Sequence, residues 1–173
     1  MKTVKKLSFV ILCFFFLSSC DDELTILDVN TSFTKEITLS IPASGEITMP
    51  YSINFSENTD LDDYLNHIEN VKINSIKYKV ISFTGTSDTV GGEVSLASEG
   101  EIFGPYTHNS FVNDIQSQTT FPINDVDKLT ILANKLKNAK QLDINVTGST
   151  NATEMSTLIL KIDFDLTVAV QAL

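Results

Sequence analysis

The chain has 173 residues, of which 22 are acidic and 12 are lysine, with no arginine and a formal net charge of −10. This length is enough for one domain with a core of its own. Because nucleic acids and anionic headgroups are bound chiefly by Lys and Arg, the composition excludes nucleic acid as an expected partner.

The first residues have the layout of an export signal. Lys2, Lys5 and Lys6 give a positive start, and residues 7–17 (LSFVILCFFFL) are an unbroken apolar run. A membrane-spanning helix needs about 20 apolar residues, so this run is too short to span and is predicted to be a signal peptide. A buried strand or helix is the alternative, but the lysines before the run and the small residues after it argue against it.

The apolar run ends at Leu17-Ser18-Ser19-Cys20, which resembles the lipobox of bacterial lipoproteins. In that family the cysteine thiol receives a diacylglycerol, the signal is cut just before the cysteine, and the new amino group is usually acylated. The resemblance implies a signal peptide at residues 1–19 and a lipidated Cys20 as the first mature residue. Two or three acyl chains give durable attachment, so a membrane is an expected partner through the N-terminal lipid.

Removal of the signal would leave 154 of the 173 residues, with all 22 acidic residues, nine lysines and a net charge of −13. Cys13 would leave with the signal, so no disulfide is possible within the mature chain. Residues 20–32 are expected to be the lipidated cysteine and a tether, provided that LTILDV at 24–29 does not dock as a strand. Residues 33–173 are expected to form a single β-rich domain.

The composition and the residues behind Cys20 also suggest a source. Lysine as the sole strong base, abundant Asn and Ile, and the acidic cluster Asp21, Asp22 and Glu23 resemble envelope lipoproteins of the Bacteroidota. Acidic clusters in this position resemble export signals for surface display there, whereas Asp after the cysteine resembles an inner-membrane retention mark in enterobacterial lipoproteins. The resemblance implies the cell envelope, with the outer membrane favoured and the inner membrane left open.

Alternating apolar residues predict strands behind the tether. Residues 33–41 and 47–55 alternate on either side of a turn at 42–45, and are expected to pair as a hairpin. Pro50 lacks a backbone N–H, which favours an edge strand. Residues 158–170 are apolar at every even position, which indicates one dry and one wet face. At about 43 Å, this strand is expected to bend or to serve two sheets.

Three further strands are predicted between these runs. In residues 71–83 the alternation shifts by one residue near Asn74 and Ser75, which indicates a β-bulge. Residues 93–98 follow a glycine-containing loop, and residues 141–147 alternate again. Both segments are predicted to be short strands.

Helices are predicted at 125–140, with Asn124 or Asp125 as the cap, and at 60–70. Residues 100–123 carry irregularly spaced aromatics and are predicted to be a packed loop. These elements indicate an antiparallel β-sandwich, immunoglobulin-like or similar, with one or two short helices. The alternative is an α+β fold in which one helix packs on an antiparallel sheet.

The sequence offers no recognisable catalytic set. The only histidines are His67 and His108, no G-x-S-x-G or H-E-x-x-H motif occurs, and a surface or hydrogen-bonded structural role is predicted for both histidines. No motif selects a carboxylate pair of the glycosidase kind. The chain is therefore predicted not to be an enzyme and to need no cofactor, with a hydrolase of unrecognised carboxylate site as an alternative.

One acidic cluster is a candidate calcium site. Asp60, Asp62 and Asp63 supply three carboxylates, but they lack the glycine and glutamate of an EF-hand loop. Asp is also favoured at helix starts, so capping is the competing interpretation, and no metal is predicted.

The aromatics Phe103, Tyr106 and Phe111 are the candidate binding surface. With the lipid anchor, they favour a non-catalytic binding or adhesion module for an unknown protein or glycan partner. A structural accessory subunit of an envelope complex is the alternative. Burial of all three side chains would leave the binding hypothesis without this surface.

Overall fold

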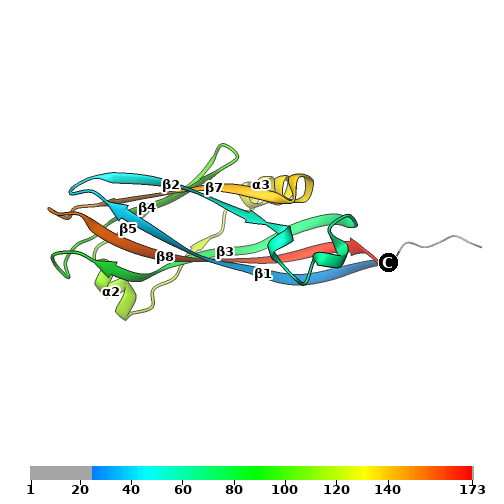
Figure 1. Ribbon diagram of the computed structural model, residues 1–173, viewed down its shortest axis with the longest axis horizontal. Coiled ribbons are helices and arrows are strands. Elements are labelled where there is room, and N and C mark those ends of the chain that lie inside the picture. Colours follow the sequence, from blue (N-terminus) through cyan, green and yellow to red (C-terminus); the bar gives the residue numbers. More distant parts are fainter. Residues whose placement is uncertain (1–24, 173) are drawn as a thin grey trace, which may run out of the picture.

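The computed structural model describes residues 25–172, which form a sandwich of two antiparallel four-stranded sheets (Figure 1). The predicted signal peptide, Cys20 and the acidic cluster behind it lie outside the described residues. No helix within 25–172 is long and apolar enough to cross a membrane.

The elements in chain order are β1 (Ile26–Ile41), β2 (Glu46–Asn54), η1 (Phe55–Glu57), η2 (Asp62–Tyr64), β3 (Ile68–Thr84), β4 (Gly92–Ser98), β5 (Glu101–His108), α2 (Phe111–Gln116), β6 (Phe121–Ile123), α3 (Val126–Ala139), β7 (Gln141–Thr150) and β8 (Ser156–Gln171).

The strand order is that of a jelly roll. The first sheet has the order β1-β8-β3-β6 and the second has the order β2-β7-β4-β5. Most hydrogen-bonded neighbours are therefore far apart in the chain, as in an eight-stranded double Greek key. The predicted antiparallel sandwich is confirmed, but its order is not that of the immunoglobulin fold.

The predicted hairpin between the first two strands does not form. The turn is present, since the Gly45 N–H donates to the Pro42 carbonyl at 3.1 Å, but it leads from one sheet to the other. β1 pairs with β8 and β2 pairs with β7 along their lengths. Alternation specifies which face is buried, not which strand lies alongside. Pro50 lies on the edge strand β2, as predicted.

The central strand of the first sheet is β8, which pairs with β1 on one side and β3 on the other. Its even-numbered side chains from Leu158 to Val170 are at most 1% exposed, which confirms the predicted dry face. Burial of one such aliphatic or aromatic side chain contributes about 1.5–3 kcal/mol. The strand stays in one sheet over its whole length, so of the two predicted alternatives, bending or serving two sheets, the second is wrong.

The bulge predicted in β3 is confirmed, because the register with β8 shifts between Ile73 and Ser75. β4 and β7 also form where strands are predicted. The segment 100–123 is not a loop, as it contains β5, α2 and β6. Its irregular aromatic spacing reflects three short elements in succession, none long enough to show a period.

Of the two predicted helices, only α3 forms. The Lys128 backbone N–H donates to the Asp125 side chain at 3.2 Å, which confirms Asp125 as the cap. Residues 60–70 instead contain the single turn η2 and the start of β3. There Leu61 and Ile68 reach the core from separate irregular and extended segments, so a helix is not needed to bury them.

The domain begins earlier than predicted, because β1 starts at Ile26. Ile26 pairs with Gln171, so residues 26–32 of the expected tether belong to the first sheet. Most of the stretch LTILDV at 24–29 therefore docks as a strand and is not part of a tether.

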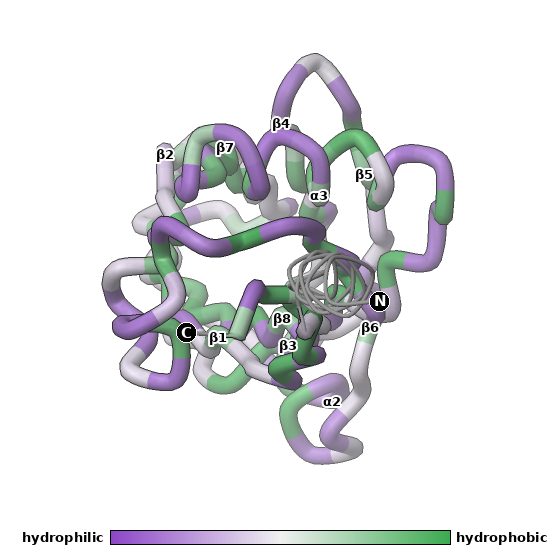
Figure 2. Tube along the Cα trace, turned by 90° about the vertical axis from the view of Figure 1, so that its right-hand side faces the viewer, coloured by the Kyte–Doolittle hydropathy of each residue, from purple (hydrophilic) through white to green (hydrophobic). Residues whose placement is uncertain are grey.

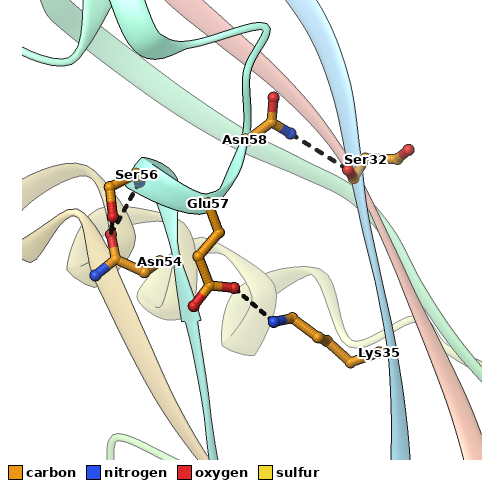
Figure 3. Close-up of polar contacts among 6 residues, drawn as sticks. All are labelled: Ser32, Lys35, Asn54, Ser56, Glu57 and Asn58. Carbon is orange, nitrogen blue, oxygen red and sulfur yellow. Dashed lines mark hydrogen bonds and ion pairs between the residues drawn. The ribbon is translucent and has the colours of Figure 1, made fainter.

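Residues 54–58 fold over the edge strand β1 (Figure 3). The Asn58 side-chain amide donates to Thr31 Oγ1 at 2.6 Å and to the Ser32 carbonyl at 3.3 Å. Lys35, the one charged residue that interrupts the alternation of β1, forms an ion pair with Glu57. Covered edges and inward-pointing charges both prevent a long edge strand from pairing with another chain.

The hydroxyl of Tyr51 is buried without a hydrogen-bond partner among the described residues. An unpaired buried hydroxyl costs about 1–3 kcal/mol. Tyr51→Phe is therefore expected to leave the free energy of unfolding unchanged or to raise it by about 1 kcal/mol in chemical denaturation. Tyr78→Phe is the matched control and should lower this free energy, because the Tyr78 hydroxyl bonds His108. A clear loss of stability in Tyr51→Phe would show that its hydroxyl is paired.

Candidate functional site: the groove between α3 and β3

The aromatic residues predicted as a binding surface do not form one. Phe103 is 5% exposed and Phe111 is fully buried, while Tyr106 is half-buried against the core. Burial of an aromatic ring stabilises the folded state, whereas an exposed ring on β5 or α2 would not. The prediction of an aromatic surface patch is therefore wrong.

These aromatics instead pack around His108. The His108 ring lies 4.4 Å from that of Phe121 and 5.1 Å from that of Phe111, measured between centroids. Tyr78 stacks on Phe121 at 5.0 Å and meets Tyr106 edge to face at 5.4 Å. The cluster joins β3 and β6 of the first sheet to β5 of the second sheet and to α2.

A polar chain runs through this cluster. Tyr78 Oη lies 2.9 Å from His108 Nε2, and His108 Nδ1 lies 2.7 Å from Asp114 Oδ2. Burial lowers the pKa of His108, and the bond to Asp114 partly offsets this effect. Burial also raises the pKa of Tyr78, so its hydroxyl remains protonated and available as a donor.

A base oriented by a carboxylate is also found in catalytic sites. Here the His108 side chain is fully buried and both ring nitrogens are bonded to protein, so no substrate atom can reach them. The network attaches α2 to the sheet through Asp114. Of the two roles predicted for His108, exposed on the surface or hydrogen-bonded within the structure, the structure shows the second.

The calcium candidates are engaged in local structure. Asp60 Oδ2 accepts from Thr31 Oγ1 at 3.2 Å, and the Asp60 N–H donates to the Asn58 side chain at 2.9 Å. Asp62 and Asp63 lie in the turn η2. Within residues 25–172, no three His, Cys, Asp or Glu side chains gather closely enough to hold a metal ion. The three carboxylates thus do not converge as a calcium site requires.

A groove of about 460 Å³ lies between α3 and the first half of β3. Figure 2 looks along the strands from this end and shows α3 between the layer of β7 and β4 and the layer of β8 and β3. The floor of the groove is apolar and is formed by Val71, Ile73, Leu129 and Ala133. Its volume is within the range of about 300–1,000 Å³ that is usual for ligand sites.

The position of α3 is set by lysines on the side away from the groove. Lys128 Nζ donates to the Ile102 carbonyl at 2.7 Å, and Lys135 Nζ lies 3.1 Å from Glu99 Oε2. These contacts attach α3 to the β4–β5 hairpin of the second sheet. Another face of the helix therefore looks toward β3, with Asn134 along the groove.

The polar lining consists mainly of asparagines: Asn70 and Asn74 on β3, Asn124 before α3, and Asn134 on α3. The Asn74 amide donates to Thr167 Oγ1 at 2.9 Å. Each of the other three amides can both donate and accept, so the lining suits a neutral, hydrogen-bonding ligand. Lys72 is the charged residue of the lining, and it forms no ion pair with the described residues. No sequence motif links residues 70–74 with residues 124–134, so this site could not be predicted from the sequence.

No protein-family model matches the chain, and no curated protein matches it. Among solved structures, the decameric BFDV capsid protein is 9% identical with a TM-score of 0.40, covering 82% of this chain and 99% of that one. The acidic stable capsid of Helicobacter pylori bacteriophage KHP30 is 12% identical with a TM-score of 0.40, covering 86% and 100%.

Dimeric latent PorU from Porphyromonas gingivalis is also similar, at 10% identity and a TM-score of 0.34, covering 89% of this chain and 14% of that one. Likenesses at this level carry no argument about function. The jelly-roll strand order is given by the observed strand pairing and does not depend on these similarities.

Proposed function

We propose that this chain is a lipid-anchored envelope protein whose jelly-roll domain is a non-catalytic binding module, with the groove between α3 and β3 as its ligand site. The observation that carries the proposal is the groove itself, which combines an apolar floor with the side-chain amides of Asn70, Asn124 and Asn134. The lipobox resemblance at Cys20 supports the anchor. The outer membrane is the proposed location.

Asn134→Trp tests the ligand site, because Asn134 is exposed and lines the groove. An indole at this position would fill the groove without disturbing the core. The full chain in detergent is to be applied to arrays of glycans and of peptides. Ligands that bind the wild-type chain are expected to lose about tenfold or more in affinity for Asn134→Trp.

Asn138→Trp is the matched control, since Asn138 is exposed one turn further along α3 and is not part of the groove lining. It should bind like the wild type. Equal binding by the two tryptophan variants and the wild type would place any ligand elsewhere. Absence of binding to both arrays would contradict the binding module.

A further inference from the structure

The groove lies along a stretch of β3 that lacks a strand neighbour among the described residues. β6 is three residues long and pairs only with Ile76–Tyr78 of β3. At Asn124 the chain leaves the sheet, and α3 follows. On the side of β3 that faces away from β8, residues 70–74 thus have no strand neighbour among the described residues, and α3 packs against β3 along the groove.

The hydrogen bonds between β3 and β8 determine which backbone groups of β3 face away from β8. The Gln171 N–H donates to the His67 carbonyl at 2.9 Å, so odd-numbered residues of β8 bond to β3. In the observed register, Asn70 faces Ala169 and Lys72 faces Thr167. Antiparallel strands alternate in this way, so the backbone N–H and C=O groups of Val71 and Ile73 point into the groove.

We propose that this groove binds an extended polypeptide segment of another protein, which adds to the first sheet as a strand in the lane of β6. This inference rests on the proposed function and names its ligand class. An extended polypeptide presents backbone donors and acceptors at every second residue, which matches the positions of Val71 and Ile73. The added strand would lie about 4.8 Å from β3. Residues 70–74 span about 13 Å, which is enough for about four paired residues.

The lining also specifies side chains. Residues of the added strand that face inward would rest on the apolar floor, where Leu129 and Ala133 are buried. Residues that face outward would lie beside Lys72, which favours an acidic residue opposite it. None of the lining residues is aromatic, so the groove lacks a platform on which a sugar ring would stack.

The probe is a pool of capped heptapeptides with Val, Ile or Leu at positions 2, 4 and 6 and Glu at position 3 or 5. Binding to the full chain in detergent is measured up to about 1 mM peptide. The best binder is then N-methylated at its odd or at its even positions. Of these two N-methylated peptides, one is expected to bind about tenfold more weakly and the other to bind as before, because only every second N–H group of the peptide faces β3.

Amide hydrogen exchange provides the residue-level test. The bound peptide is expected to slow exchange of the Val71 and Ile73 amides by about tenfold or more and to leave Lys72 unchanged, since its amide already bonds β8. Asn134→Trp should abolish both effects, whereas Asn138→Trp should keep them. Replacement of Glu by Lys in the best binder should lower its affinity for the wild type about threefold, and Lys72→Glu should reverse this preference.

The outcomes separate the two proposals. No binding by any peptide of the pool, equal loss in both N-methylated peptides, or unchanged exchange at Val71 and Ile73 would each overturn strand addition. If a glycan then binds in a manner that Asn134→Trp abolishes, the binding module stands with a different ligand. If neither class binds, both proposals fail.

Discussion

Unfolding in denaturant is expected to show that His108→Ala lowers the free energy of unfolding by about 3 kcal/mol. Removal of a buried ring that packs on Phe111 and Phe121 leaves a cavity, which costs about 2–5 kcal/mol for large-to-small changes in a core. The Tyr78 hydroxyl also loses its acceptor, and an unpaired buried hydroxyl costs about 1–3 kcal/mol. These effects overlap, so their sum is an upper bound.

A double-mutant cycle separates the two contributions. Tyr78→Phe combined with His108→Ala removes the hydroxyl that the single variant leaves unpaired, so the double variant should be less unstable than the two single changes predict together. A coupling of about 1 kcal/mol is expected. Strict additivity would show that the bond between Tyr78 and His108 does not contribute to stability.

The same residue makes stability depend on pH. Burial lowers the folded-state pKa of His108 from its ordinary value of 6.5, despite Asp114. Below about pH 6.5 the unfolded chain binds a proton at this histidine more readily than the folded protein does. The contribution of His108 is therefore complete above pH 6.5 and is lost as the pH falls toward the folded pKa.

The wild-type free energy of unfolding is expected to decline as the pH falls below about 6.5, a range that begins above the titration of ordinary carboxylates. His108→Gln should flatten this decline, and His67→Gln, which alters the other histidine, should keep it. Identical slopes in the wild type and His108→Gln would remove His108 as the cause.

Cys20→Ala is expected to abolish membrane attachment of the chain. The lipobox resemblance places the acyl chains on Cys20, and each buried methylene contributes about 0.8 kcal/mol, so two or three chains hold a protein durably. Without the thiol no thioether to the diacylglycerol can form. The measurement is the distribution of the protein between membrane and soluble fractions.

Cys13→Ala is the matched control, because Cys13 lies inside the predicted signal and should be dispensable. The anchor prediction fails if Cys20→Ala still fractionates with membranes after its signal is removed. Protease added to intact cells then determines the face: loss of the domain supports surface display, and protection until the envelope is breached contradicts it.

Burial patterns within single elements could be predicted from the sequence. Apolar residues at every second position of β8 face the core because side chains of a strand alternate between its two faces. α3 follows from a helical stripe with Asp125 before it, whose side chain bonds the first turn. The bulge in β3 follows from one shift in the alternation. Each of these features depends on neighbours within a few residues.

The segments with mixed signals were predicted poorly. Residues 60–70 have a helical stripe but form a turn and the start of β3, and Phe103 and Phe111 look like surface aromatics but are buried. In both cases burial in the assembled sandwich outweighs a local preference. His108 was correctly predicted to be structural, although its partners Tyr78 and Asp114 could not be named.

The sequence by itself determined which face of each long strand is buried, where α3 begins, and a lipobox-like segment ahead of the domain. Only the tertiary structure decided that β1 pairs with β8 and not with β2, and that α3 lies beside the part of β3 that has no strand neighbour among the described residues. The physical reason is range: a side-chain period is a property of neighbouring residues, whereas strand order and the groove depend on contacts between segments far apart in the chain.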